Sequence, residues 1–118
     1  MGGTEDLGAV KGGLAPAQKT KLASLVSYQT GAVVSRTLVD TKAGTVTLFA
    51  FDEGEGLSEH TAPFDALLYL LEGEADVTVA RIPSHLEPMD AIILPAGKPH
   101  AVRASRKFKM LLVMIRAR

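Results

Sequence analysis

Two histidines are the residues of this chain best suited to do chemistry. His60 stands ahead of the apolar run Leu67–Leu71, and His100 stands just past a Pro/Gly turn that follows the apolar run Ala91–Leu94. Both histidines are therefore predicted at strand starts, where they would share one site. Imidazole titrates near neutral pH and binds divalent metals, so such a site could hold a metal or transfer protons.

A metal held by this pair would need a further ligand. A first-row divalent ion usually takes at least three protein ligands, often two histidines and a carboxylate. Asp65 is the candidate carboxylate, while Glu59 alternates to the opposite face of a regular strand from His60. Three alternatives stay open: a site of His60, His100 and Asp65 for Mn, Fe, Co, Ni or Zn, a two-histidine metal site completed by water or a ligand, and a hydrogen-bonding pocket without metal.

Strand alternation predicts what surrounds the pair. If His60 faces inward, alternate residues of the same and neighbouring strands share its face. They are almost all apolar, which suits a small planar or aliphatic molecule with one polar or anionic group. His85 lies outside this pattern and is predicted at the surface. The residues predicted to line the ligand site with His60 and His100 are Ala62, Ala66, Leu68, Phe49, Phe51, Val102 and Met110.

The elements that must position these residues are short strands. Each apolar or alternating run is bounded by a turn, and eight or nine strands at hairpin spacing predict an all-β sandwich or barrel. Residues 1–13 contain five glycines and predict a mobile tail, so that residues 14–118 form a single domain. A short helix or turn is expected after Pro16.

Composition excludes several classes of function. The formal net charge is +0, which argues against nucleic-acid binding. No apolar run approaches a membrane span, no signal peptide is recognisable, and cysteine is absent, so we expect a cytoplasmic protein without a membrane partner. The runs Leu67–Leu71 and Met110–Ile115 are apolar without alternation, which predicts cover on both faces and favours a homodimer.

From Val33 to Ile115 the sequence resembles the cupin superfamily, specifically the small single-domain conserved-barrel (cupin 2) type. His60 falls on the first histidine of the first cupin motif and Gly73 on its closing glycine. Pro95, Gly97 and His100 match the second motif position by position. The resemblance implies an antiparallel double-stranded β-helix, a jelly-roll barrel, with a site at its open end.

The chain departs from the family at two metal-ligand positions, because Ala62 replaces the second histidine and Ala66 the glutamate. Asp90 and Ala104 stand where the second motif usually has glycine and asparagine, which are not ligands. Two functions follow as hypotheses. The first is a small-molecule-binding cupin, with or without a divalent metal. The second is a metal-dependent cupin enzyme of the dioxygenase, isomerase or lyase type that uses His60 and His100, so catalysis stays open.

Overall fold

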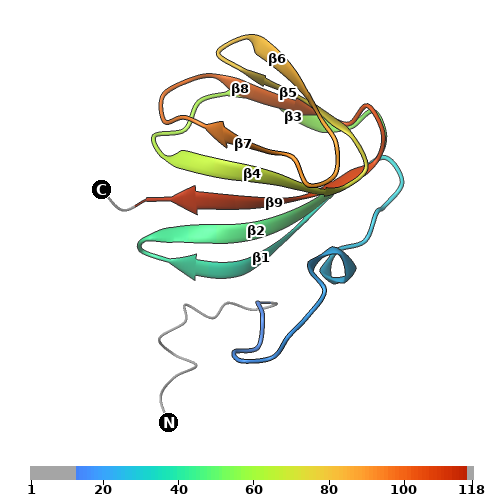
Figure 1. Cartoon of the computed structure of the whole chain (residues 1–118), viewed down its shortest axis with the longest axis vertical. Helices are drawn as coiled ribbons and strands as arrows, with labels where there is room; N and C mark the ends of the chain where they lie inside the picture. The colour runs from blue at the N-terminus through green and yellow to red at the C-terminus, as the bar shows by residue number, and fades with distance from the viewer. Residues whose placement is uncertain (1–12, 117–118) are drawn as a thin grey trace.

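In the computed structural model, which describes residues 13–116, the chain folds into two antiparallel sheets that face one another (Figure 1). A 3-10 helix, η2 (Leu22–Leu25), precedes the strands and is the helix expected after Pro16. The all-β prediction is confirmed. The described strands are β1 (Val33–Thr41), β2 (Gly44–Phe51), β3 (Gly56–His60), β4 (Asp65–Glu72), β5 (Ala75–Val79), β6 (Ile82–Leu86), β7 (Ala91–Leu94), β8 (His100–Arg103) and β9 (Phe108–Ile115).

The strand order shows the jelly-roll topology. One sheet has five strands in the order β1-β2-β9-β4-β7, and the other has four in the order β3-β8-β5-β6. Most neighbours in these sheets are far apart in the sequence, as β9 between β2 and β4 illustrates. The double-stranded β-helix is therefore confirmed. The mobile tail predicted for residues 1–13 lies, except for Gly13, outside the described residues.

Alternation along the strands creates the main core between the sheets. On β4, Ala66, Leu68 and Leu70 are buried and point inward, while Asp65 and Leu67 are exposed on the outer face. Phe51 and Phe108 stack with ring centroids 4.4 Å apart at one end of this core. Ala75, Val77 and Val102 of the four-stranded sheet are buried in the same core, so apolar burial holds the two sheets together.

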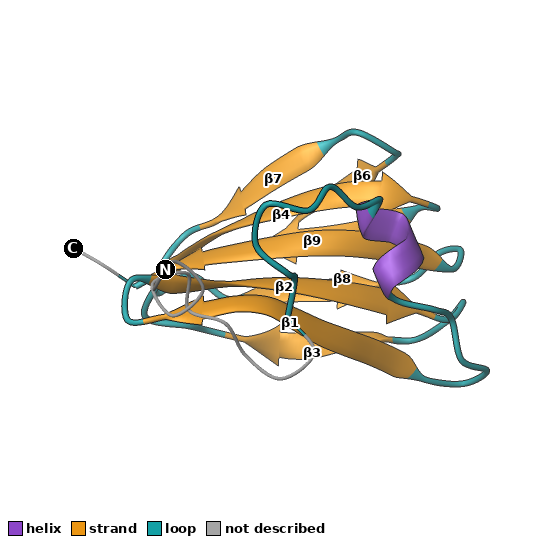
Figure 2. Ribbon diagram, turned by 90° about the horizontal axis from the view of Figure 1, so that it is seen from below, coloured by secondary structure: helices purple, strands orange, loops and turns teal. Residues whose placement is uncertain are grey.

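A second core covers the outer face of the five-stranded sheet at its β1–β2 side. Leu38, Leu48 and Ala50 are buried there beneath the segment that carries η2, which crosses this face (Figure 2). Val26 of this segment is buried against them. The Tyr28 hydroxyl donates a 2.7 Å hydrogen bond to Glu72, and burial followed by this carboxylate raises the tyrosine pKa. The N-terminal segment is thus fastened to β4. Among the described residues, no helix is long and apolar enough to cross a membrane.

The close approach of the chain at Gly73 explains why glycine follows β4. Gly73 has a φ of +82°, and a Cβ there would collide with the backbone carbonyl of Lys107 and with Phe108. This glycine turns the chain from the five-stranded into the four-stranded sheet, directly beside the stacked phenyl rings. Its match to the closing glycine of the first motif therefore has a steric cause.

The two-residue turn between β5 and β6 carries backbone strain that can be measured. Ala80 and Arg81 both have positive φ, at 49° and 65°, where glycine or asparagine is usual. We expect Arg81→Gly to raise the free energy of unfolding by about 0.5–1 kcal/mol in urea denaturation, because relief of strain exceeds the added flexibility of the unfolded chain. The Arg81 to Glu59 contact, at 3.9 Å between exposed groups, contributes little.

Lys42 provides the matched control, because it lies in the two-residue turn between β1 and β2 but lacks a positive φ. Lys42→Gly should lower stability, since glycine only adds flexibility there. Equal effects of the two substitutions would contradict the assignment of strain to Arg81.

Candidate functional site

The two candidate histidines are direct neighbours on adjacent strands. His60 is the last residue of β3 and His100 the first of β8, and the two are paired across these antiparallel strands. The prediction of two strand starts is therefore wrong for His60, which ends a strand. The prediction that the two residues share one location holds in this structure.

An irregularity in β3 decides which side chain faces His100. Leu57 pairs with Val102 and points into the core, but the next pairing is His60 with His100, so the register shifts between Leu57 and His60. In a regular strand Glu59 would occupy that inward position and His60 would face outward. The extra residue is a β-bulge, a device that re-aims side chains at functional sites.

The two imidazole rings meet edge to face through their outer nitrogens. Nε2 of His60 and Nε2 of His100 are 3.1 Å apart, with ring centroids 4.3 Å apart and planes at 70°. Nδ1 of His60 lies 2.8 Å from the Ser58 carbonyl, so it must carry the proton that it donates. In the neutral pair, the Nε2 lone pair of His60 therefore accepts the N–H of His100.

The two rings differ in burial, and burial changes the pKa of His100. His60 is exposed, whereas His100 is only 8% exposed, and its Nδ1 is buried without a hydrogen-bond partner. Burial, and then the nearby His60, lower the pKa of His100, and the Lys98 carbonyl only partly opposes this shift. The lowered pKa favours the neutral ring of His100, whose Nε2–H donates to Nε2 of His60. Metal binding also requires the neutral ring.

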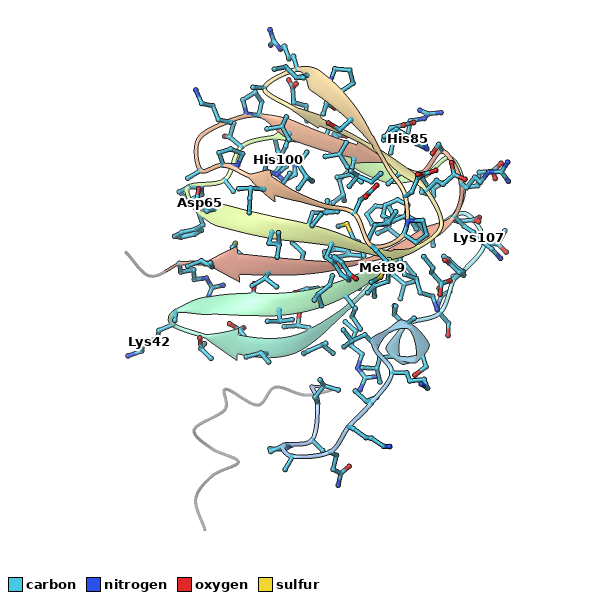
Figure 3. The ribbon with its side chains drawn as sticks, viewed as in Figure 1. Lys42, Asp65, His85, Met89, His100 and Lys107 are labelled. Atoms are coloured by element: carbon cyan, nitrogen blue, oxygen red, sulfur yellow. The ribbon has the colours of Figure 1, made fainter. Side chains whose placement is uncertain are left out.

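Asp65 does not join the histidine pair. It points to the outer face of β4, and its carboxylate accepts a 2.8 Å hydrogen bond from the backbone N–H of Ala96. Within residues 13–116, no group of three or more His, Asp or Glu residues is placed to hold a metal. The predicted site of two histidines and Asp65 is therefore not formed here. Figure 3 shows Asp65 and His100 at the same end of the sheets, with His85 at the other end.

Five of the residues predicted to line a ligand site are buried in the main core, and the other two are not. Ala66, Leu68, Phe51, Val102 and Met110 do point inward, but each is buried in the main core, and Leu68 and Phe51 have no exposed surface. Phe49 is partly buried beside them. Ala62 is in the loop after β3, where its carbonyl accepts the N–H of Gly97.

Sequence reasoning missed two groups next to the pair. Val79 on β5 is the cross-strand neighbour of His100, and the Ser58 carbonyl orients His60. The alternation of Val77 and Val79 indicates that both face inward, but it does not indicate which strand lies beside His100. The role of Ser58 depends on the bulge and leaves no pattern in the sequence.

His85 lies apart from the pair, on the outer face of the four-stranded sheet. Its ring nitrogens are 2.7 Å from the Asp76 carboxylate and 2.9 Å from that of Glu74. These two carboxylates, Asp76 foremost, raise the pKa of His85. Its surface position agrees with the sequence-based expectation.

The chain has three histidines, so one NMR titration of imidazole signals tests these shifts in opposite directions. In chelator-treated protein, His85 should titrate above and His100 below the usual pKa of 6.5. Asp76→Asn should lower the pKa of His85 and leave that of His100 unchanged. Titration of His100 above 6.5 would contradict its buried, neutral state.

The same shifts predict opposite effects of pH on stability. His100 binds a proton less readily in the folded state, so its contribution favours folding above pH 6.5 and is lost as the pH falls toward its folded pKa. The contribution of His85 is present below pH 6.5 and is lost as the pH rises through its raised pKa.

Comparison with known protein families identifies the family of this chain. The model of the "Cupin domain" family matches residues 47–116, which include both histidines. The chain belongs to the cupin family. Its site thus retains one histidine from each cupin motif, on β3 and β8.

Solved structures agree with this assignment. A conserved protein of unknown function from Streptococcus pyogenes is 31% identical with a TM-score of 0.84, covering 89% of this chain and 92% of that chain. A cupin superfamily protein from Desulfitobacterium hafniense is 33% identical with a TM-score of 0.81, covering 86% and 94%. A cupin 2 conserved barrel domain protein from Leptotrichia buccalis is 39% identical with a TM-score of 0.76, covering 79% and 45%. No curated protein matches this chain.

Proposed function

We propose that this cupin binds a small, largely apolar molecule where His60 and His100 meet, and that the histidine pair holds the polar group of that molecule. The observation that carries the proposal is the 3.1 Å contact between the two Nε2 atoms. One ring of the pair is exposed and the other is buried. Such a pair is open to a ligand on one side and anchored in the core on the other.

The neighbours of the pair favour an apolar ligand. Val79 flanks His100, and positions 62 and 66, where the family motif has a histidine and a glutamate, carry alanine in this chain. A densely charged ligand would lose its hydration here without charged partners in return. A planar or aliphatic molecule with one hydroxyl, carbonyl or carboxylate group fits this chemistry better.

A second candidate is a metal-dependent cupin enzyme, and the spacing of the same two atoms favours it. Two metal–nitrogen bonds of about 2.1 Å that meet near a right angle place their nitrogens about 3 Å apart. His60 and His100 would thus occupy two adjacent positions at one Mn, Fe, Co, Ni or Zn ion, with water or the bound molecule at the others. The Ser58 carbonyl already holds His60 in the tautomer that directs its Nε2 lone pair at the site. Such an ion would polarise an oxygen atom of the bound molecule.

Benzoate, a planar molecule with one carboxylate, is a suitable probe of the binding site. In amide-detected NMR titrations, we expect benzoate to shift signals around residues 60, 62, 79 and 100. His60→Ala and His100→Ala should weaken binding at least tenfold, because each removes half of the pair. His85→Ala is the matched control and should bind as the native protein does. Shifts that persist in both pair variants would contradict the proposal.

Calorimetric titration with Co²⁺ or Zn²⁺ separates the two candidates. One ion per chain, lost in His60→Ala and in His100→Ala but kept in His85→Ala, would support the metal centre. If the protein binds benzoate but no metal, the first candidate, a binding protein without a metal, is supported. Absence of both would refute the site.

Asp65→Ala tests the placement of the carboxylate. Because Asp65 accepts the Ala96 N–H at the surface and alanine has no acceptor, this substitution should lower the free energy of unfolding by about 0.5–1.5 kcal/mol. The affinity for Co²⁺ should stay within twofold of the native value. A sharp loss of Co²⁺ affinity with unchanged stability would mean that Asp65 turns toward the pair.

A further inference from the structure

Arg81 occupies the turn between β5 and β6, beside the strand that carries His100. Val79, the last residue of β5, is the cross-strand neighbour of His100. The backbone N–H of Ala80 donates a 2.8 Å hydrogen bond to the carbonyl of Pro99, the residue directly before His100. Two consecutive residues thus fasten the chain to the start of β8 immediately before Arg81.

The side chain of Arg81 extends across the start of β8. In the four-stranded sheet β8 lies between β3 and β5, so β3 and β5 are about 10 Å apart. The Nε atom of Arg81 is nevertheless 3.9 Å from the carboxylate of Glu59, the residue before His60 on β3. Because β3 and β5 end where β8 begins, this contact spans the edge of the sheet at which His60 and His100 meet.

The guanidinium of Arg81 is available to a ligand. Its side chain is 83% exposed, and 3.9 Å exceeds hydrogen-bonding distance, so the contact with Glu59 is weak. Within residues 13–116, the guanidinium has no hydrogen bond. Its paired N–H groups match the geometry of a carboxylate.

The backbone at this turn indicates that the arginine is present for its side chain. Arg81 has a φ of 65° and follows Ala80, which has a φ of 49°. Glycine adopts such angles without strain, whereas a residue with a Cβ does not. Strained residues concentrate at sites where a side chain has a task. The task here lies beside the histidine pair.

We propose that Arg81 selects molecules with one carboxylate group for the site at His60 and His100. This inference rests on the proposed function and specifies the polar group of the bound molecule. The guanidinium leaves Glu59, and Arg81 and the histidine pair together hold the two oxygen atoms of the carboxylate. A single cation at the edge of an otherwise apolar site suits a monoanion better than a densely charged molecule.

Parallel NMR titrations with benzoate and benzamide test this proposal, because the two molecules share a shape and differ in charge. The native protein should bind benzoate more tightly than benzamide. Arg81→Gln should lower the affinity for benzoate about fivefold, the effect of one charge-assisted contact at an exposed edge. Its affinity for benzamide should stay at the native value, since an amide gains little from a guanidinium.

Arg106→Gln is the matched control for the loss of a positive charge. Arg106 is likewise exposed, at 73%, and lies near a glutamate, Glu74, but it follows the end of β8 and not its start. This variant should bind both probes as the native protein does. Lys98→Gln is the competing variant, because Lys98 is the nearest cation to His100 in the sequence.

Three outcomes would overturn the proposal. Arg81→Gln could bind benzoate as tightly as the native protein, it could lose both probes equally, or Lys98→Gln alone could lose benzoate. In each of these cases the native protein still binds a probe, so the proposed function stands. Failure of the native protein to bind either probe would refute the proposed function and this proposal with it.

Arg81→Gly links selectivity to the strain of the turn. This variant should be more stable than the native protein in urea, as expected above, and should lose the same share of benzoate affinity as Arg81→Gln. A stabilised Arg81→Gly variant with native benzoate affinity would show that the strain serves no ligand.

Discussion

The β-bulge between Leu57 and His60 is the constraint on which the site depends. Because β3 and β8 are paired, whichever side chain follows Leu57 on the inner face must meet His100. The extra residue selects His60 and turns Glu59 toward solvent, where it lies near Arg81. A carboxylate in that position would form an ion pair with the imidazole, whereas a second imidazole gives a neutral N–H to N hydrogen bond.

The site therefore differs from a complete metal centre in its electrostatics. With alanine at positions 62 and 66, the two imidazole rings have no carboxylate beside them in the described structure. The charge of a divalent cation held there would be balanced only by an anionic ligand. The two alanines also leave the surroundings apolar. The affinity of the site for a metal would therefore depend more strongly on a bound anionic molecule than at a site of four protein ligands.

Much of the fold was predictable from the sequence, because alternation and turn residues specify strands locally. The apolar run Ala91–Leu94 coincides with β7, and the other two apolar runs lie within β4 and β9. Gly73 marks a turn that admits no Cβ. The meeting of His60 and His100 was also predictable from their place in the two motifs. The bulge was not, because an inserted residue leaves no local pattern.

Two other features could not be read from the sequence. Asp65 is one residue from the family's glutamate position, but one residue reverses the face of a strand, and the Ala96 N–H then engages its carboxylate. Phe51, Leu68 and Met110 point inward as expected. The dense packing of the core around Phe51 also involves its stacking on Phe108, and these two residues lie on strands that are far apart in the sequence. The apolar runs predict cover on both faces, but they do not indicate which part of the sheet the N-terminal segment covers.

The most direct test of a single site is NMR detection of the hydrogen bond between the two imidazoles in chelator-treated, ¹⁵N-labelled protein. The account predicts a scalar coupling between Nε2 of His60 and Nε2 of His100 across that bond, with the proton of His60 on Nδ1. Absence of the coupling at neutral pH, together with a proton on Nε2 of His60, would contradict the pairing on which the proposed function rests.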